Sequence, residues 1–238
     1  MGPIRVLVVD DSALVRTVLE KGLSLDPSIE VVGTAPDPYE ARDKIVRLRP
    51  DVITLDVEMP RMTGLEFLRK LMPQYPLPVI MVSSRTERGR QITLECLAAG
   101  AVDFVAKPTT DIASGLNAML TELRTKIKIA STANVSHWKH MRSQMRPHTC
   151  ASGLCGGAEG IIAIGASTGG TEAIREVIAK FPVRTPGVVI VQHMPAGFTK
   201  MFAERMNQLC QMEVLEASDG DRVIPGRILI APGGLQMR

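Results

Sequence analysis

Hydrophobic and polar positions follow two alternating patterns in the first half of the chain. Short runs of valine, isoleucine and leucine are separated by segments whose apolar residues recur at helical spacing, such as Ala41, Ile45 and Leu48. The strand-like runs lie at residues 4–11, 30–35, 51–57, 78–84 and 102–108, and the helical segments at 12–25, 37–49, 64–72, 90–100 and 110–127. Apolar strands that alternate with helices are typical of a parallel sheet covered on both faces. We therefore predict a doubly wound, five-stranded parallel α/β domain at residues 1–128.

The same alternation returns near the other end of the chain. Strand-like runs lie at residues 160–167, 187–195, 213–217 and 226–234, with helical segments at 171–181 and 198–210. This pattern predicts a second parallel α/β domain at residues 159–238. Residues 129–158 show neither pattern and are rich in small, polar and basic residues, which predicts an interdomain linker.

The predicted linker contains residue types that bind zinc. They are His137, His140, His148, Cys150 and Cys155. Their spacing fits no standard zinc finger, so an ordinary solvated hinge is the favoured interpretation.

Composition narrows the possible functions. The 238 residues are 45% hydrophobic and 22% charged, which indicates a globular protein. A net charge of +3 and an aromatic content of 3% give no reason to expect nucleic-acid binding. We expect no membrane insertion, because the apolar runs are of strand length, and the first residues show no signal-peptide pattern. The four cysteines form no CxxC pair, so we expect a cytoplasmic protein.

Polar residues gather where the first five strands end. They are Asp10, Asp11, Asp56, Ser83 and Lys107. The carboxyl ends of parallel strands line one crevice, where three carboxylates repel one another unless a cation lies between them. Oxygen ligands suit Mg²⁺ better than zinc, and a lysine and a hydroxyl at the same edge can hold phosphoryl oxygens. The alternative is a set of strand-end acids that simply face water.

The segments "VLVVDDS", "DVITLDVEMPRMTG", "MVSS" and "GAVDFVAKP" closely resemble the receiver domain of two-component response regulators, which has a flavodoxin-like fold. The resemblance implies that Asp56 accepts phosphate from a histidine kinase. It also implies that Mg²⁺ is held by Asp10, Asp11, Asp56 and the backbone carbonyl of Glu58. Lys107 would pair with the phosphoryl group, Ser83 would move to bond it, and Phe104 would be the switching aromatic. The peptide between Lys107 and Pro108 is a candidate for the cis form.

The stretch "IIAIGASTGGTEAIREVIAK" predicts a strand, a glycine-rich turn and a helix. Its G-x-S-x-G pattern exposes a nucleophilic serine in some hydrolases, and here the serine is Ser167. His193 ends the next strand-like run, and neighbouring parallel strands would bring the two residues together, because such strands lie about 5 Å apart. A nucleotide-binding loop would leave both residues without a role. As structural alternatives, Ser167 is a helix N-cap and His193 a surface histidine.

The segments "IGASTGGTEAI" and "VVIVQHMPAGFTKMFAERM" closely resemble the Rossmann-like catalytic domain of chemotaxis protein-glutamate methylesterases, which also follow a receiver domain. The resemblance implies that Ser167 is the nucleophile, His193 the base and Thr168 an active-site neighbour. The substrate would be a glutamate methyl ester on chemoreceptors, many members also deamidate receptor glutamines, and the esterase site would need no cofactor.

The third catalytic residue of that family is an aspartate late in the domain. Asp219 and Asp221 lie in "SDGDRVIPG", which resembles a loop well upstream of it, so we expect the third acid not to lie on this chain and residues 159–238 to form only the N-terminal part of the catalytic domain. Two functions stay open at this point. One is a phosphorylation-controlled methylesterase, and the other is a catalytically impaired response regulator that acts as a phosphate sink or binds receptors.

Overall fold

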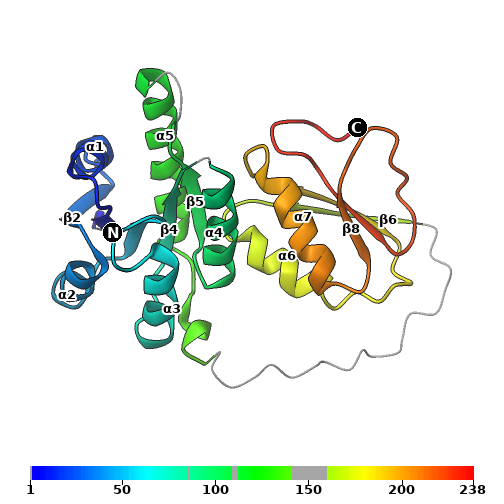
Figure 1. The fold of residues 1–238 in the computed structure, drawn as a ribbon, viewed down its shortest axis with the longest axis horizontal. Helices are drawn as coiled ribbons and strands as arrows, with labels where there is room; N and C mark the ends of the chain where they lie inside the picture. The colour runs from blue at the N-terminus through cyan, green and yellow to red at the C-terminus, as the bar shows by residue number, and fades with distance from the viewer. Residues whose placement is uncertain (1, 85, 109–111, 141–159) are drawn as a thin grey trace. The chain divides into compact units, whose positions relative to one another are not determined.

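The computed structural model describes residues 2–84, 86–108, 112–140 and 160–238 (Figure 1). The chain forms two compact units, Met1–Gln144 and Met145–Arg238, each of which is described by itself below. None of the helices in the described residues has the length and hydropathy needed to cross a membrane. Three residues of the zinc-binding types in the predicted linker, His148, Cys150 and Cys155, lie outside the described residues.

The first unit is built on a five-stranded sheet in the order β2-β1-β3-β4-β5, with every neighbouring pair parallel. Its strands are β1 (Ile4–Val9), β2 (Ile29–Ala35), β3 (Val52–Asp56), β4 (Val79–Ser83) and β5 (Asp103–Ala106). All residues of β3, β4 and β5 are buried, as expected for strands covered on both faces. The predicted fold class is therefore confirmed for this unit.

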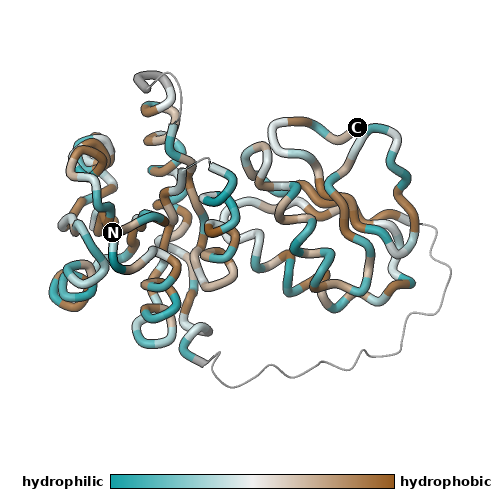
Figure 2. Tube along the Cα trace, in the orientation of Figure 1, coloured by the Kyte–Doolittle hydropathy of each residue, from teal (hydrophilic) through white to brown (hydrophobic). Residues whose placement is uncertain are grey.

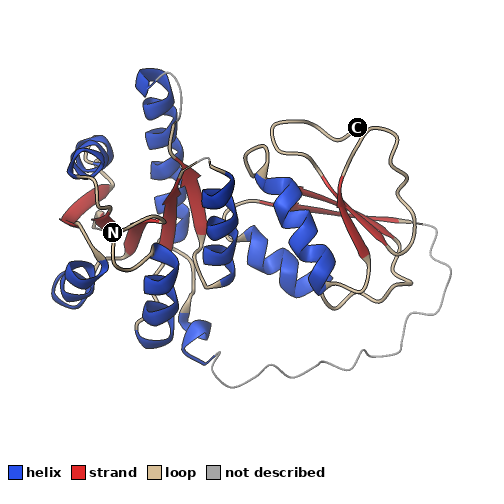
Figure 3. Cartoon of the chain, viewed as in Figure 1, coloured by secondary structure: helices blue, strands red, loops and turns tan. Residues whose placement is uncertain are grey.

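Five helices connect and cover these strands (Figure 3). They are α1 (Ala13–Leu23), α2 (Pro38–Leu48), α3 (Gly64–Gln74), α4 (Glu87–Ala98) and α5 (Ile112–Ala130). Their starts follow from local side-chain chemistry: Asp37 caps α2, and Thr63 and Glu66 form a reciprocal capping box on α3. Gly22 of α1 lies so close to Leu120 of α5 that a Cβ there would be 2.6 Å from its side chain. The helices α1 and α5 therefore lie side by side on one face of the sheet.

The first unit continues past the last predicted helical residue. The helix α5 extends to Ala130, and Ser136–His140 form a short 3₁₀ helix, η1, which contacts α3. Trp138 lies against Gly100, whose φ of +111° requires a glycine. Residues 131–140, part of the predicted linker, are thus attached to the first unit.

The second unit contains a four-stranded parallel sheet in the order β6-β7-β9-β8. Its strands are β6 (Ile161–Ala166), β7 (Gly187–Gln192), β8 (Glu213–Glu216) and β9 (Arg227–Ile230), and its helices are α6 (Gly170–Ile178) and α7 (Phe198–Leu209). Buried apolar residues of both helices cover the strand positions Val188, Ile190 and Ile228. In Figure 2 the strands of both units are the most hydrophobic segments, which locates their cores. The second predicted α/β unit is also confirmed.

The opposite face of this second sheet is partly bare among the described residues. Strand β6 lies at the edge, and its burial alternates along the strand. The side chains of Ile161 and Val191 are 63% and 53% exposed. A parallel sheet is normally covered on both faces, so this unit leaves apolar surface in contact with water.

Candidate functional site

Three acidic residues meet at the carboxyl edge of the first sheet. Asp10 follows β1, Asp11 comes next, and Asp56 ends β3, which is the neighbour of β1. One carboxylate oxygen from each lies within 4.8 Å of the others. Asp10 and Asp56 are buried, whereas Asp11 is exposed. The three acids that the sequence placed at strand ends are therefore brought together by the fold.

Lys107 partly neutralises this cluster. Its Nζ lies 2.9 Å from Asp10 Oδ2 and 3.0 Å from Asp56 Oδ2. Burial raises the pKa of Asp56 to about 6; Lys107 opposes this shift, and the nearby Asp10 adds to it. Burial lowers the pKa of Lys107, but its two carboxylate partners raise it further, so that the net pKa is above the usual value. At neutral pH both groups are mainly charged.

The backbone at Asp56 is tightly constrained by the start of α3. A Cβ at Gly64 would lie 2.1 Å from the carbonyl oxygen of Asp56, so only glycine fits this position. Glu58, the expected carbonyl ligand, donates its backbone N–H to Asp56 Oδ1 over 3.5 Å, and its side chain is exposed. The loop therefore holds residue 58 next to the acidic cluster.

The two expected switch residues are buried in this structure. The Ser83 hydroxyl lies 2.6 Å from that of Thr93 on α4, and it is within hydrogen-bond distance of the Gly89 carbonyl. Phe104 lies beneath Lys126, whose Nζ is 5.3 Å from the ring centre. Bonding of Ser83 to a phosphoryl group would therefore require it to leave its partners on α4. The peptide between Lys107 and Pro108 is trans, so the expectation of a cis bond was wrong; trans is the more stable form of most X–Pro bonds.

The turn between β6 and α6 presents Ser167 at the carboxyl edge of the second sheet. The side chains of Ser167 and His193 are both exposed, and Thr168 is half-buried. The N-cap of α6 is Gly169, with a φ of +76°, which corrects the structural alternative that Ser167 caps this helix. Because glycine adopts this conformation without strain, the turn can bend sharply after the serine.

Ser167 and His193 follow neighbouring parallel strands. The strands β6 and β7 pair in register up to Ala166 and Gln192, and His193 N–H donates to the carbonyl of Ala166 over 3.1 Å. The next residue on each strand is thus Ser167 on one side and His193 on the other. The backbone places the two residues side by side, as the sequence predicted; the contact between their side chains stays a prediction.

Gln192 is a functional candidate that the sequence analysis missed. It is buried, and its Nε2 donates to the carbonyl oxygens of Ser167 and His193 over 3.0 and 3.3 Å. Its Oε1 is buried without a hydrogen-bond partner in the described part of the chain. One side chain therefore connects the turn that carries the serine to the residue that carries the imidazole. The available signal was a single amide at the end of the apolar run "GVVIVQ".

Several acids lie at or beyond the end of β8; Glu216 is its last residue and accepts a hydrogen bond from the Thr199 hydroxyl. Asp219 and Asp221 follow β8, which is separated from β7 by β9. Strands are spaced about 4.8 Å apart, so this separation is on the order of 10 Å. Asp221 accepts the backbone N–H of Ser218 over 2.7 Å and thus stabilises its own loop.

The first unit has the fold and the strand-end acid cluster of a response-regulator receiver, and it is followed by an α/β unit that exposes a serine on a strand-to-helix turn. Residues 6–120 match the response regulator receiver domain family, and residues 162–238 match the CheB methylesterase family.

Similar proteins agree with both matches. A protein-glutamate methylesterase/protein-glutamine glutaminase of Syntrophotalea carbinolica is 70% identical over 99% of this chain and 67% of its own length. One of Salmonella typhimurium is 51% identical over 100% of this chain and 67% of its own. The crystal structure of the response regulator domain of Thermotoga maritima CheB has a TM-score of 0.51 and 48% identity, covering 56% of this chain and 98% of that domain. The chain belongs to the CheB family of protein-glutamate methylesterase/protein-glutamine glutaminases.

Proposed function

We propose that this chain is a phosphorylation-regulated protein-glutamate methylesterase that removes methyl groups from chemoreceptor glutamates and deamidates receptor glutamines. Phosphate transferred to Asp56 from a histidine kinase raises the activity of a site formed by Ser167 and His193. The observation that carries the proposal is the alignment of these two residues at the ends of paired parallel strands, in a chain that also gathers three acids and a lysine at the edge of its first sheet.

The phosphoryl acceptor in this proposal is Asp56. One of its carboxylate oxygens attacks the phosphorus of a phosphohistidine, so that a P–O bond forms as the P–N bond breaks. A pKa of about 6 leaves this carboxylate mainly ionised at neutral pH, as a nucleophile requires. Lys107 Nζ, which already lies 3.0 Å from Asp56, would form an ion pair with the transferred phosphoryl oxygens.

A divalent cation fits the acidic cluster. Asp10, Asp11 and Asp56 offer oxygen ligands within 4.8 Å of one another, the donor set that Mg²⁺ prefers. When bound there, the ion would neutralise negative charge on the phosphoryl group. The carboxylates of these three residues, with the carbonyl of Glu58, would hold it.

Ester hydrolysis would follow the chemistry of serine hydrolases. His193 takes the proton of Ser167 as Oγ attacks the ester carbonyl, and it returns the proton to the departing methanol. Water then attacks the acyl-enzyme, with His193 again accepting a proton, and releases glutamate and free Ser167. For a glutamine substrate the leaving group is ammonia. Thr168 adjoins the nucleophile and would contact the bound acyl group.

Turnover by this chain should be low. Among the described residues no carboxylate forms an ion pair with the imidazole of His193, and a histidine without an orienting acid can adopt the wrong tautomer, which lowers rates by about 10⁴-fold. A fusion that adds the remaining third of the Syntrophotalea carbinolica relative to residue 238 should raise the rate. The ratio of the two rates measures how much hydrolysis Ser167 and His193 support without the remaining third of the relative.

The deciding measurement is methanol release from methylated receptor, with and without a phosphodonor and Mg²⁺. Ser167→Ala should abolish release by the fused chain, because it removes the nucleophile. Ser218→Ala is the matched control, since this exposed serine lies in the same unit and should leave the rate unchanged. Release that persists in Ser167→Ala would refute the proposed nucleophile.

A second candidate is favoured by the difference between the two sites. The phosphorylation cluster is assembled and bonded to Lys107, whereas the described residues place only Ser167 and His193 together at the other site. If only the first site is functional, the chain acts as a phosphate sink or as a receptor-binding module. It would be phosphorylated at Asp56 but would show no Ser167-dependent methanol release, whereas the first candidate predicts a low release that Ser167→Ala removes.

A further inference from the structure

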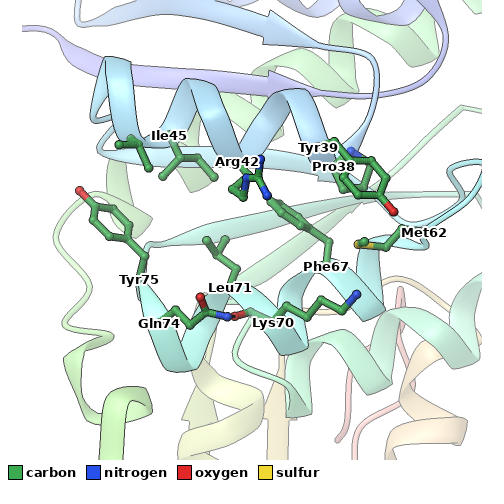
Figure 4. Close-up of a pocket in the computed structure, with 11 residues that line it drawn as sticks. Pro38, Tyr39, Arg42, Ile45, Met62, Phe67, Lys70, Leu71, Gln74 and Tyr75 are labelled. Atoms are coloured by element: carbon green, nitrogen blue, oxygen red, sulfur yellow. Dashed lines mark hydrogen bonds between the residues drawn. The ribbon is translucent and has the colours of Figure 1, made fainter.

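A groove runs between α2 and α3 of the first unit and has a volume of about 520 Å³ (Figure 4). Phe67 and Leu71 of α3 and Ile45 of α2 form its apolar lining. Each helix has 11 residues, which corresponds to a length of about 16 Å. An extended peptide of about five residues has the same length.

Two tyrosines at the ends of the groove are partly exposed to solvent. Tyr39 lies near one end and Tyr75 near the other, and they are 48% and 41% exposed. Neither tyrosine is needed to complete the core beneath, which is closed by the buried Phe67 and Leu71. Exposed tyrosines beside an apolar depression are typical of protein-binding surfaces.

The charged residues that line the groove are cations. Its lining includes the cations Arg42 and Lys70 and no carboxylate. Arg42 has only a surface ion pair with Asp43, in which both side chains are about two-thirds exposed, and such pairs contribute little. No ion pair of Lys70 occurs within the described residues.

The acidic residues near the groove already form helix caps or ion pairs within the first unit. Asp37 caps α2 and pairs with Arg61, and Glu66 belongs to the capping box of α3. Glu40 pairs with Lys44. The groove therefore combines an apolar floor with a net positive rim.

We propose that the groove between α2 and α3 binds a short acidic peptide segment of a partner protein, with a bulky apolar side chain seated between Tyr39 and Tyr75 and carboxylates facing Lys70 and Arg42. The apolar side chain would displace water from the exposed surfaces of Tyr39, Val46 and Tyr75. The carboxylates would supply the negative charge that the rim lacks. This binding is independent of the Ser167 site and of its activity.

The test uses the full chain and a phage library of random 12-residue peptides, selected on the unchanged chain alone. The enriched peptides should combine leucine, phenylalanine or tryptophan with aspartate or glutamate. Fluorescence anisotropy of a labelled peptide from this set should show that Lys70→Glu weakens binding about fivefold or more, as expected for a reversed rim charge. Tyr75→Ser should also weaken binding by removing one end of the apolar seat.

The matched control is Lys21→Glu on α1, a reversal of the same charge on the opposite face of the sheet, which should leave affinity unchanged. A peptide with lysines in place of its carboxylates should bind Lys70→Glu better than the unchanged chain, a gain that misfolding cannot produce. The proposal is overturned if no peptide is enriched, if the enriched peptides carry no excess of carboxylates, or if Lys70→Glu binds them as well as Lys21→Glu does.

Discussion

The two units share a parallel α/β architecture but differ in how completely the described strands are buried. In the first, β3, β4 and β5 are buried along their whole length, and the side chains at their ends are fixed by short contacts such as that of Lys107 with Asp56. In the second, the edge strand β6 is alternately exposed, and the strand leads directly to Ser167. The positions of side chains at strand ends depend on how firmly the sheet beneath them is packed. The first unit therefore holds its strand-end residues in fixed contacts, whereas the second carries the proposed nucleophile and base on a less supported sheet.

The largest expected effect concerns phosphorylation at the acidic cluster of the first unit. Asp56→Asn should abolish phosphorylation of the chain by acetyl phosphate in the presence of Mg²⁺, because an amide cannot form the acyl phosphate. Incorporation of labelled phosphate into the protein measures this effect. Asp43→Asn, a change of the same kind at an exposed position on α2, should leave incorporation unchanged. Phosphate found at another residue of Asp56→Asn would show that the cluster has been misassigned.

The difference in sheet burial can be tested with one pair of truncations. Ile53→Ala removes a fully buried side chain from β3 and should destabilise the first unit by about 3 kcal/mol. Ile161→Ala on the exposed edge strand should change the stability of the second unit by about 0.5 kcal/mol or less. Hydrogen exchange of β3 and β6 amides reports each unit separately. Equal losses in both strands would contradict the proposed difference in support.

Removing the buried charge at Asp56 should stabilise the first unit. Its pKa is raised from 3.8 to about 6, so the fold favours the protonated form. That stabilisation is complete below pH 3.8 and is lost as the pH rises through about 6. At neutral pH without Mg²⁺, Asp56→Asn should therefore raise the free energy of unfolding by about 1–2 kcal/mol. Urea unfolding followed by the fluorescence of Trp138, the single tryptophan, measures the first unit; a loss of stability would contradict the sign.

A smaller effect on catalysis should come from Gln192. Gln192→Leu removes its hydrogen bonds to the carbonyls of Ser167 and His193, and it also removes a buried acceptor that has no partner. These changes oppose each other in stability, but the turn loses its connection to β7. We expect kcat of the fused chain to fall about tenfold with little change in unfolding.

Gln192→Glu is the informative companion variant, because it keeps the shape of the side chain but replaces its donor. It should resemble Gln192→Leu in kcat if the donated hydrogen bonds position the serine. An unchanged kcat in both variants would exclude a positioning role for Gln192.

The fold class was predictable because apolar strands and amphipathic helices repeat with clear periods, whereas the order of the strands was not predicted. The meeting of Asp10, Asp11 and Asp56 was predictable for the same reason, since parallel strands end at one edge. The role of Gln192 was not, because a strand pattern does not show which carbonyls a side chain reaches. The groove between α2 and α3 was also missed, since Tyr39 and Tyr75 are far apart in sequence and their helical pattern indicates only partial burial.

The ammonium group of Lys107 lies between two of the three carboxylates in the first unit. A counterion that is part of the chain lets the fold persist when no metal is bound, so chelation should silence phosphorylation without melting the domain. Loss of signalling through ion depletion would then be reversible, and a cell could restore it without synthesising new protein.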